Sequence, residues 1–169
     1  ALVSYIFCLD AHLDVALLSV STKKNYNQVA MLAAKDYFFD SWIRRMSINM
    51  VMNLIPIDRK INGVRNFSIE NTLSLCKAFM DYEKRNLIMF PEGTRVEAGS
   101  VGKYARSSFE LAKRNGVKVL PLCHNSGSCW PAHKFVKKPG TITLKIGKPF
   151  FVDDSKESAL RTEEWVTDN

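Results

Sequence analysis

A group of polar residues suited to binding an anion follows directly after a short apolar segment. Residues 87–90 are Leu, Ile, Met and Phe, and this run predicts a buried parallel strand. Pro91 lacks a backbone N–H and ends the strand pairing. Four residues with binding or catalytic potential therefore come at the carboxyl end of the strand, which is where ligands bind in open α/β sheets: Glu92, Gly93, Thr94 and Arg95.

Each of these residues offers a distinct function. The planar guanidinium of Arg95 can hold a phosphate or a carboxylate through two parallel hydrogen bonds. Glu92 can orient that guanidinium or act on a proton, and Gly93 permits a tight turn and the close approach of a ligand. The alternative interpretation is a strand-end turn that carries a surface Glu–Arg pair.

A second arginine occupies a similar position. Residues 53–59 read as a short strand with a polar end, in which Pro56 favours an edge strand or a bulge. Asp58 and Arg59 fall at the end of this strand. Arg59 and Arg95 can therefore converge on one phosphate, although a local ion pair between Asp58 and Arg59 is the alternative.

The elements that must position these residues alternate along the chain. Strands are predicted at residues 2–8, 28–34, 53–59, 87–90, 117–121 and 141–146, the last of them half-exposed. Helices are predicted at residues 15–20, 38–50, 68–84 and 106–115, and from Asp154 to about Val166. This alternation predicts one α/β domain over residues 1–169, with a mostly parallel mixed sheet flanked by helices. The polar loops at the strand ends, including that of His124, then gather at one edge.

Composition narrows the class of partner. A net charge of +7 and a pI of about 9.3 suit an anionic substrate, an anionic membrane surface or nucleic acid. The usual nucleic-acid docking motifs are absent, so no specific nucleic-acid partner is expected. The apolar helix at residues 38–50 carries Arg44 and Arg45, which is typical of a core helix or of a membrane-surface helix. No apolar run reaches the ~18 residues of a spanning helix, and we expect an upstream segment, such as a membrane anchor, before Ala1.

The four cysteines predict thiols and no metal site. Cys8, Cys76, Cys123 and Cys129 show no CxxC pairing and no metal-ligand spacing with histidine. Three of the four lie in apolar runs. We therefore expect buried free thiols in a reducing compartment.

Three segments resemble one enzyme family. Residues 90–95, Phe-Pro-Glu-Gly-Thr-Arg, are similar to the third sequence block of glycerolipid acyltransferases of the lysophosphatidic acid acyltransferase type. Residues 57–59 resemble the second block and residues 119–121 the fourth. The resemblance implies a glycerol-3-phosphate acyltransferase-like fold. It also implies transfer of a fatty acyl group from acyl-CoA or acyl-carrier protein to the free hydroxyl of a lysophospholipid such as lysophosphatidate. No metal or cofactor is implied. The protein would lie at the cytoplasmic face of a membrane, held there peripherally or by an anchor.

The same resemblance implies residue roles. Arg59 and Arg95 would bind the phosphate, Gly93 and Thr94 would complete the binding turn, and Glu92 would orient Arg95 or the acceptor glycerol. In the family a histidine five positions before an aspartate is the general base, and the aspartate orients its imidazole. Asp14 matches that aspartate, but Leu9 stands where the histidine is expected.

Leu9 leaves two functions open. His12 lies two positions before Asp14 and can reach the site in a sharp turn, while His124 can supply an imidazole from another strand end. The catalytic candidates are therefore Asp14, His12 and Glu92, and the chain is then an O-acyltransferase. The alternative is a catalytically impaired protein of the same fold that binds a phosphate or lipid. After the turn, residues 102–108 keep positive charge at Lys103 and Arg106 but carry serines where the family has glycines.

Overall fold

The chain divides into two compact units. The computed structural model describes residues 3–7, 29–34, 53–57, 69–81, 86–93, 96, 99–129 and 138–169. One unit comprises Lys24–Ile88, and the other comprises Val3–Lys23 together with Met89–Asn169. The single-domain organisation expected from the sequence stays a prediction, and each unit is described by itself below.

The unit Lys24–Ile88 holds three parallel strands. They are β2 (Val29–Ala34), β3 (Asn53–Ile57) and β4 (Asn86–Met89), in the order β3-β2-β4, and only the last residue of β4, Met89, belongs to the other unit. All four residues of β4 are buried, as expected for an apolar strand covered on both faces. β3 is the edge strand of this group, so the expectation from Pro56 is confirmed: an edge position tolerates the missing N–H.

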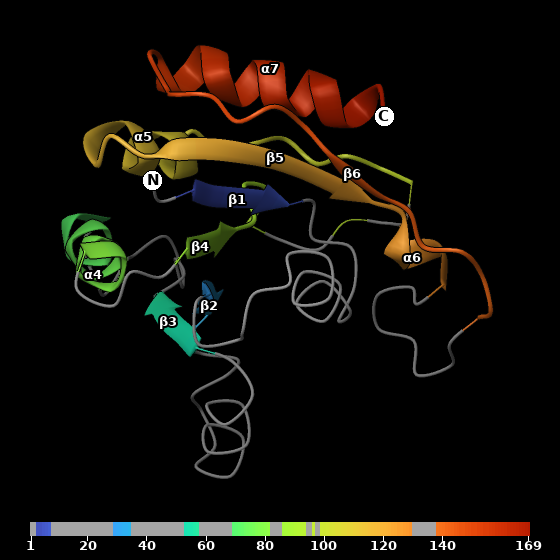
Figure 1. The fold of residues 1–169 in the computed structure, drawn as a ribbon, viewed down its shortest axis with the longest axis horizontal. Helices are drawn as coiled ribbons and strands as arrows, with labels where there is room; N and C mark the ends of the chain where they lie inside the picture. Colours follow the sequence, from blue (N-terminus) through green and yellow to red (C-terminus); the bar gives the residue numbers. More distant parts are fainter. Residues whose placement is uncertain are drawn as a thin grey trace, which may run out of the picture. The chain divides into compact units, whose positions relative to one another are not determined.

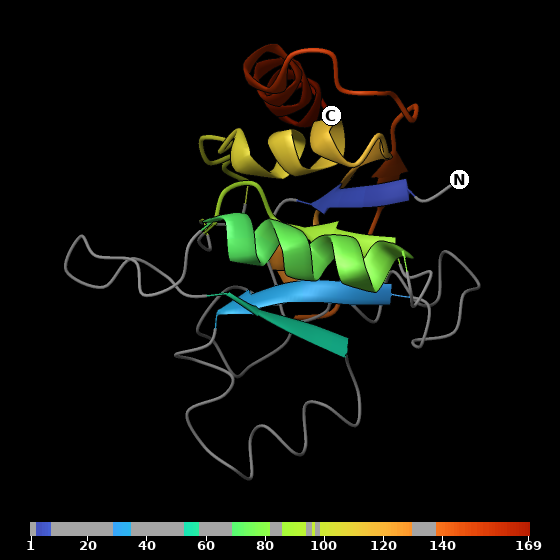
Figure 2. The same ribbon diagram turned by 90° about the vertical axis from the view of Figure 1, so that its left-hand side faces the viewer.

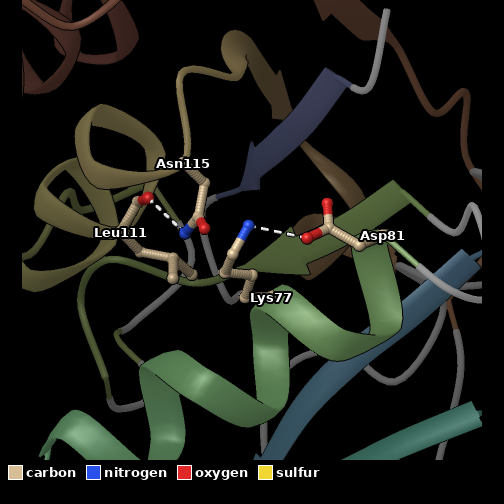
Figure 3. Close-up of polar contacts among 4 residues, drawn as sticks. All are labelled: Lys77, Asp81, Leu111 and Asn115. Atoms are coloured by element: carbon tan, nitrogen blue, oxygen red, sulfur yellow. Dashed lines mark hydrogen bonds and ion pairs between the residues drawn. The ribbon is translucent and has the colours of Figure 1, made fainter.

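The helix of this unit is α4 (Ile69–Asp81), which contacts β3. Cys76 and Met80, one helical turn apart, are both buried, so they form part of its inward face. On the exposed side, the Lys77 ammonium lies 2.6 Å from the Asp81 carboxylate, one turn further along (Figure 3). The sequence predicted this helix at residues 68–84, and the observed ends fall within that range.

The other unit combines parallel and antiparallel pairing. Its strands are β1 (Val3–Phe7), β5 (Lys118–His124) and β6 (Leu144–Ile146), in the order β1-β5-β6 (Figure 1). β1 and β5 are parallel, whereas β6 runs antiparallel to β5. The mostly parallel mixed sheet with flanking helices is therefore confirmed.

β5 is longer than the sequence predicted. The strand was expected to end at Pro121 with His124 in the following loop, but it continues to His124. The carbonyl oxygen of Pro121 accepts a hydrogen bond from the N–H of Gly147 at 2.9 Å. The strand continues because Leu122, Cys123 and His124 pair with β6, so the single missing N–H of the proline does not end it. A short helix, α6 (Ser126–Cys129), follows instead of a loop.

β6 is shorter than the predicted range of residues 141–146. The side chain of Asn125 accepts a hydrogen bond from the N–H of Thr143 at 2.8 Å and donates one to the carbonyl of Thr141 at 3.4 Å. These bonds to a side chain take the place of strand pairing just before Leu144.

Two longer helices lie side by side in this unit, α5 (Ser107–Arg114) and α7 (Ser155–Thr167) (Figure 2). α5 buries Phe109, Leu111 and Ala112. At its end the amide of Asn115 donates to the Leu111 carbonyl at 2.9 Å (Figure 3), and Gly116 adopts φ +59° as the predicted C-terminal cap.

α7 begins where the sequence predicted. The carboxylate of Asp154 accepts hydrogen bonds from the N–H groups of Lys156 at 2.9 Å and Glu157 at 2.8 Å. This satisfies two backbone donors that the first helical turn leaves without intrahelical partners. The helices predicted at residues 15–20 and 38–50 lie outside the described residues.

Candidate functional site

The residues after β4 form a tight turn. The N–H of Gly93 donates to the carbonyl of Phe90 at 3.1 Å, with Pro91 and Glu92 between them. Proline at the second position and glycine at the fourth are the preferences of a type I turn. Gly93 has φ +66°, and a Cβ atom built there would have no other atom within 4 Å. Its backbone conformation, and not lack of space, therefore favours glycine at this position.

The carboxylate of Glu92 is bonded to a later part of the chain. Its Oε1 atom accepts a hydrogen bond from the backbone N–H of Gly102 at 2.8 Å. The contact is close: a Cβ atom on Gly102 would lie 2.9 Å from Val96 Cγ1 and 3.2 Å from Glu92 Cγ. One carboxylate oxygen of this predicted catalytic residue therefore holds the backbone beside the turn.

Two further backbone bonds hold the same segment. The N–H of Ala105 donates to the carbonyl of Pro91 at 2.8 Å, so residues 102–105 lie against the turn. The N–H of Tyr104 donates to Oε2 of Glu163, on α7, at 2.7 Å. Neither carboxylate contact could be predicted from local sequence patterns, since Glu163 lies 59 positions from Tyr104 and Glu92 lies 10 positions from Gly102.

Two exposed cations accompany this segment. Lys103 lies within it and Arg106 is the N-cap residue of α5. The positive end of the α5 helix dipole lies at the same position in the chain. The segment beside the Glu92–Gly93 turn therefore carries two exposed positive charges, which can interact with an anion.

His124 is less suited to proton abstraction than its residue type suggests. Its Nδ1 atom accepts a hydrogen bond from the backbone N–H of Ser126 at 3.3 Å and lies 2.9 Å from the Ser126 hydroxyl. A ring nitrogen that accepts from a backbone N–H carries no proton, so the neutral ring has its proton on Nε2. In that form Nε2 is a hydrogen-bond donor, whereas a general base needs a lone pair directed at the substrate.

The remaining predicted site residues cannot be placed. The expected base and its orienting partner, His12 and Asp14, lie outside the described residues, as do Leu9 and the three expected substrate-binding residues Arg59, Thr94 and Arg95. Glu92 and Gly93 are described, and both lie in the turn where they were expected. Convergence of the two arginines on one phosphate therefore stays a prediction.

No helix among residues 3–7, 29–34, 53–57, 69–81, 86–93, 96, 99–129 and 138–169 combines the length and apolarity needed to cross a membrane. Within the same described set, no three His, Cys, Asp or Glu side chains are grouped so that they could hold a metal ion. Three of the four cysteines, Cys76, Cys123 and Cys129, are free and buried, as the sequence predicted for thiols in apolar runs. Burial raises the pKa of the Cys123 thiol, while the nearby charge of Lys145 lowers it.

Comparison with known proteins identifies the family. The sequence model of the family described as Acyltransferase matches residues 5–125. The chain is 38% identical over 87 residues to a 1-acyl-sn-glycerol-3-phosphate acyltransferase of Pseudomonas aeruginosa, covering 48% of this chain and 34% of that protein. It is 25% identical over 115 residues to the chloroplastic 1-acyl-sn-glycerol-3-phosphate acyltransferase LPAT1 of Arabidopsis thaliana, covering 67% of this chain and 30% of that protein. The chain thus spans about a third of the length of these curated relatives.

A solved structure agrees on the fold. The crystal structure of the 1-acyl-sn-glycerophosphate acyltransferase PlsC from Thermotoga maritima matches with a TM-score of 0.71 at 21% identity, over 99% of this chain and 64% of that one. The acyltransferase-like fold expected from the sequence is therefore confirmed. Because the family match extends over most of the chain and includes the strand-end turn, the chain belongs to the acyltransferase family.

Proposed function

We propose that this chain transfers a fatty acyl group from an acyl thioester to the free hydroxyl of lysophosphatidate. The observation that carries the proposal is the family match over residues 5–125, which contains the turn at Glu92 and Gly93. The relatives that it matches are named for acyl transfer to 1-acyl-glycerol-3-phosphate. The two exposed cations in the segment beside the turn, Lys103 and Arg106, support an acceptor that carries a phosphate.

The reaction requires residues that bind the acceptor phosphate, a residue that orients the acceptor, and a general base. The acceptor hydroxyl oxygen attacks the thioester carbonyl carbon, a base takes the hydroxyl proton, the C–S bond breaks, and the thiol leaves with a proton. Arg59 and Arg95 would hold the phosphate so that the hydroxyl is directed at the thioester. Glu92, with one oxygen on the Gly102 N–H, would orient Arg95 or the glycerol. In this scheme His12 is the base and Asp14 orients its imidazole.

Leu9 favours a second function. Leucine cannot take a proton, and it stands where the family's base is expected. A chain that keeps the phosphate-binding turn and lacks the base would bind lysophosphatidate without acylating it. The two functions share the same binding residues and differ only in turnover.

Acyl-transfer assays distinguish the two functions. The chain, its Leu9→His variant and its His12→Ala variant are incubated with lysophosphatidate and either acyl-CoA or acyl-carrier protein, with monoacylglycerol as the acceptor that lacks phosphate. Activity in the unmodified chain that is lost in His12→Ala supports the enzyme with His12 as base. Activity only in Leu9→His supports the binding function. The proposal fails if neither chain acylates lysophosphatidate and the unmodified chain does not bind it.

The location and the donor are part of the same proposal. A net charge of +7 suits a peripheral position on an anionic membrane surface, at the cytoplasmic face where acyl thioesters are present. Sedimentation with vesicles of phosphatidylglycerol, against vesicles of phosphatidylcholine alone, tests this position. Association with the anionic vesicles that weakens as salt rises is the expected result, and equal association with both kinds of vesicle contradicts it.

A further inference from the structure

We propose that Glu163, on α7, is a positioning residue for the acceptor site. It would hold residues 102–106 against the strand-end turn so that Lys103 and Arg106 face the acceptor phosphate. The inference rests on the proposed function, because it assigns a role within the same site. Glu163 would act through the backbone of Tyr104 and would not contact the substrate.

Hydrogen bonds from its backbone hold this segment in place. Residues 102–105 belong to no helix or strand, yet three of their four backbone N–H groups have acceptors elsewhere in the unit. The N–H of Gly102 donates to Glu92 Oε1, that of Tyr104 to Glu163 Oε2, and that of Ala105 to the Pro91 carbonyl. Two of the acceptors are carboxylates, which form stronger hydrogen bonds than neutral groups do.

Side-chain burial alternates along the segment. Along the segment, Lys103 is exposed, Tyr104 is 7% exposed and Ala105 is exposed again. Fixing the Tyr104 backbone and burying its side chain therefore directs the neighbouring Lys103 outward. Arg106 follows at the start of α5, so the same bond controls where both cations lie relative to the Glu92–Gly93 turn.

The helix that supplies the carboxylate, α7, is held by buried residues and by a capped first turn. Glu163 lies between buried residues of α7: Thr162 is 2% exposed and Val166 is 8% exposed. The Thr162 hydroxyl donates to the Ser158 carbonyl at 2.7 Å, and Asp154 caps the helix. α7 also contacts α5, the helix that begins at the end of the segment. The carboxylate therefore comes from a well-anchored element.

The contact between Glu163 and Tyr104 joins a helix that lies beyond the family match to a segment within it. The family match ends at residue 125, and α7 covers residues Ser155–Thr167. A helix beyond the matched residues thus holds a segment that lies within them. The structure assigns to α7 a part in organising the acceptor site and not only a part in covering the sheet.

The test compares three variants of the 169-residue chain. Glu163→Ala removes the acceptor, Glu163→Gln keeps a neutral acceptor oxygen, and Glu164→Ala is the matched control at the exposed neighbouring position. We measure the Kd for lysophosphatidate in detergent micelles and the hydrogen exchange of the residue 102–105 amides. Thermal unfolding verifies that each variant is folded.

The expected results form a graded series. Glu163→Ala weakens lysophosphatidate binding about tenfold, Glu163→Gln weakens it by less, and Glu164→Ala leaves it unchanged. Hydrogen exchange at Tyr104 and Gly102 accelerates in the same order, while exchange in β5 does not change. A purely structural role would instead accelerate exchange throughout the unit, and Glu163→Gln would not restore binding.

The outcomes separate this inference from the proposed function. If the unmodified chain binds lysophosphatidate and Glu163→Ala binds it equally well, the inference is overturned and the proposed function stands. If the unmodified chain neither binds nor acylates lysophosphatidate, the proposed function is overturned, and this inference with it.

Discussion

Replacing Gly102 with alanine tests the geometry of the site most directly. The added Cβ atom would lie 2.9 Å from Val96 Cγ1, 3.2 Å from Glu92 Cγ and 3.3 Å from Glu92 Cδ. Carbon atoms pack at about 3.5–4.0 Å, so at least one neighbour must move. Movement of the Glu92 side chain lengthens or breaks its 2.8 Å hydrogen bond with the Gly102 N–H.

The expected cost follows from these contacts. Loss of a hydrogen bond to a charged group costs about 1.5–3 kcal/mol, and crowding by one added methyl group in a packed region costs about 1–3 kcal/mol. The two costs do not simply add, because movement of Glu92 breaks the bond but relieves its own contacts with the added Cβ, which leaves only the contact with Val96 Cγ1. We therefore expect Gly102→Ala to lower the free energy of unfolding by about 2 kcal/mol. For a chain of this size that corresponds to a Tm lowered by roughly 4–8 °C.

The assay combines stability with acceptor binding. Denaturant unfolding and the Kd for lysophosphatidate are measured for Gly102→Ala and for Gly99→Ala, the matched control in the same loop. Gly99 has φ +84° and open space around its Cβ position, so alanine there adds backbone strain of ~1 kcal/mol without contacting Glu92. We expect both variants to lose stability and only Gly102→Ala to lose affinity for lysophosphatidate.

A double-mutant cycle provides the decisive result. Glu92→Ala removes the hydrogen-bond acceptor and two of the three atoms that crowd position 102, and it leaves Val96 Cγ1 in place. The part of the cost of Gly102→Ala that comes from Glu92 should therefore vanish in that background. Equal costs of Gly102→Ala with and without Glu92 would show that the two residues are not coupled. In that case the role assigned to the Glu92–Gly102 contact would be wrong.

Three further predictions concern stability and thiol chemistry. Phe109→Ala, at a fully buried residue, should lower the free energy of unfolding by about 3–5 kcal/mol in denaturant titrations, whereas Leu160→Ala, at a residue 48% exposed on α7, should change it by less than ~0.5 kcal/mol; similar costs would contradict the assigned core. The pKa of Asp154 lies below its usual 3.8, chiefly because its carboxylate accepts a hydrogen bond from the Glu157 N–H. The carboxylate therefore stabilises the fold above pH 3.8, and this contribution is lost as pH falls through the lowered pKa. Asp154→Asn should keep the cap near neutral pH and reduce the loss of stability below pH 3.8, and unfolding curves identical to those of the unmodified chain at every pH would contradict this role. Burial raises the pKa of the Cys76 thiol to about 12, so maleimide labelling followed by mass spectrometry should leave Cys76 unmodified in the folded chain and modify it after denaturation; rapid labelling of the folded chain would show that the thiol is accessible.

Local features were predicted well from the sequence. The apolar run before Pro91 is the buried strand β4, and the turn at Glu92 and Gly93 follows it as expected. Asp154 marks the start of α7, because the bonds that cap a helix join residues two or three positions apart. The family resemblance also rested on short contiguous segments, and it was confirmed by matches over much longer parts of the chain.

Contacts between distant residues were decided by the tertiary structure alone. β5 continues past Pro121 because its last three residues pair with β6, and β6 starts late because Asn125 bonds to Thr143. The role of Glu163 depends on a hydrogen bond to a residue 59 positions away. Hydrophobic periodicity and capping patterns report burial and neighbouring bonds, but a single bond between a side chain and a remote backbone N–H leaves no periodic trace in the sequence. The sequence by itself therefore determined the strand, the turn and the family, whereas only the folded chain showed which carboxylates hold the segment beside that turn.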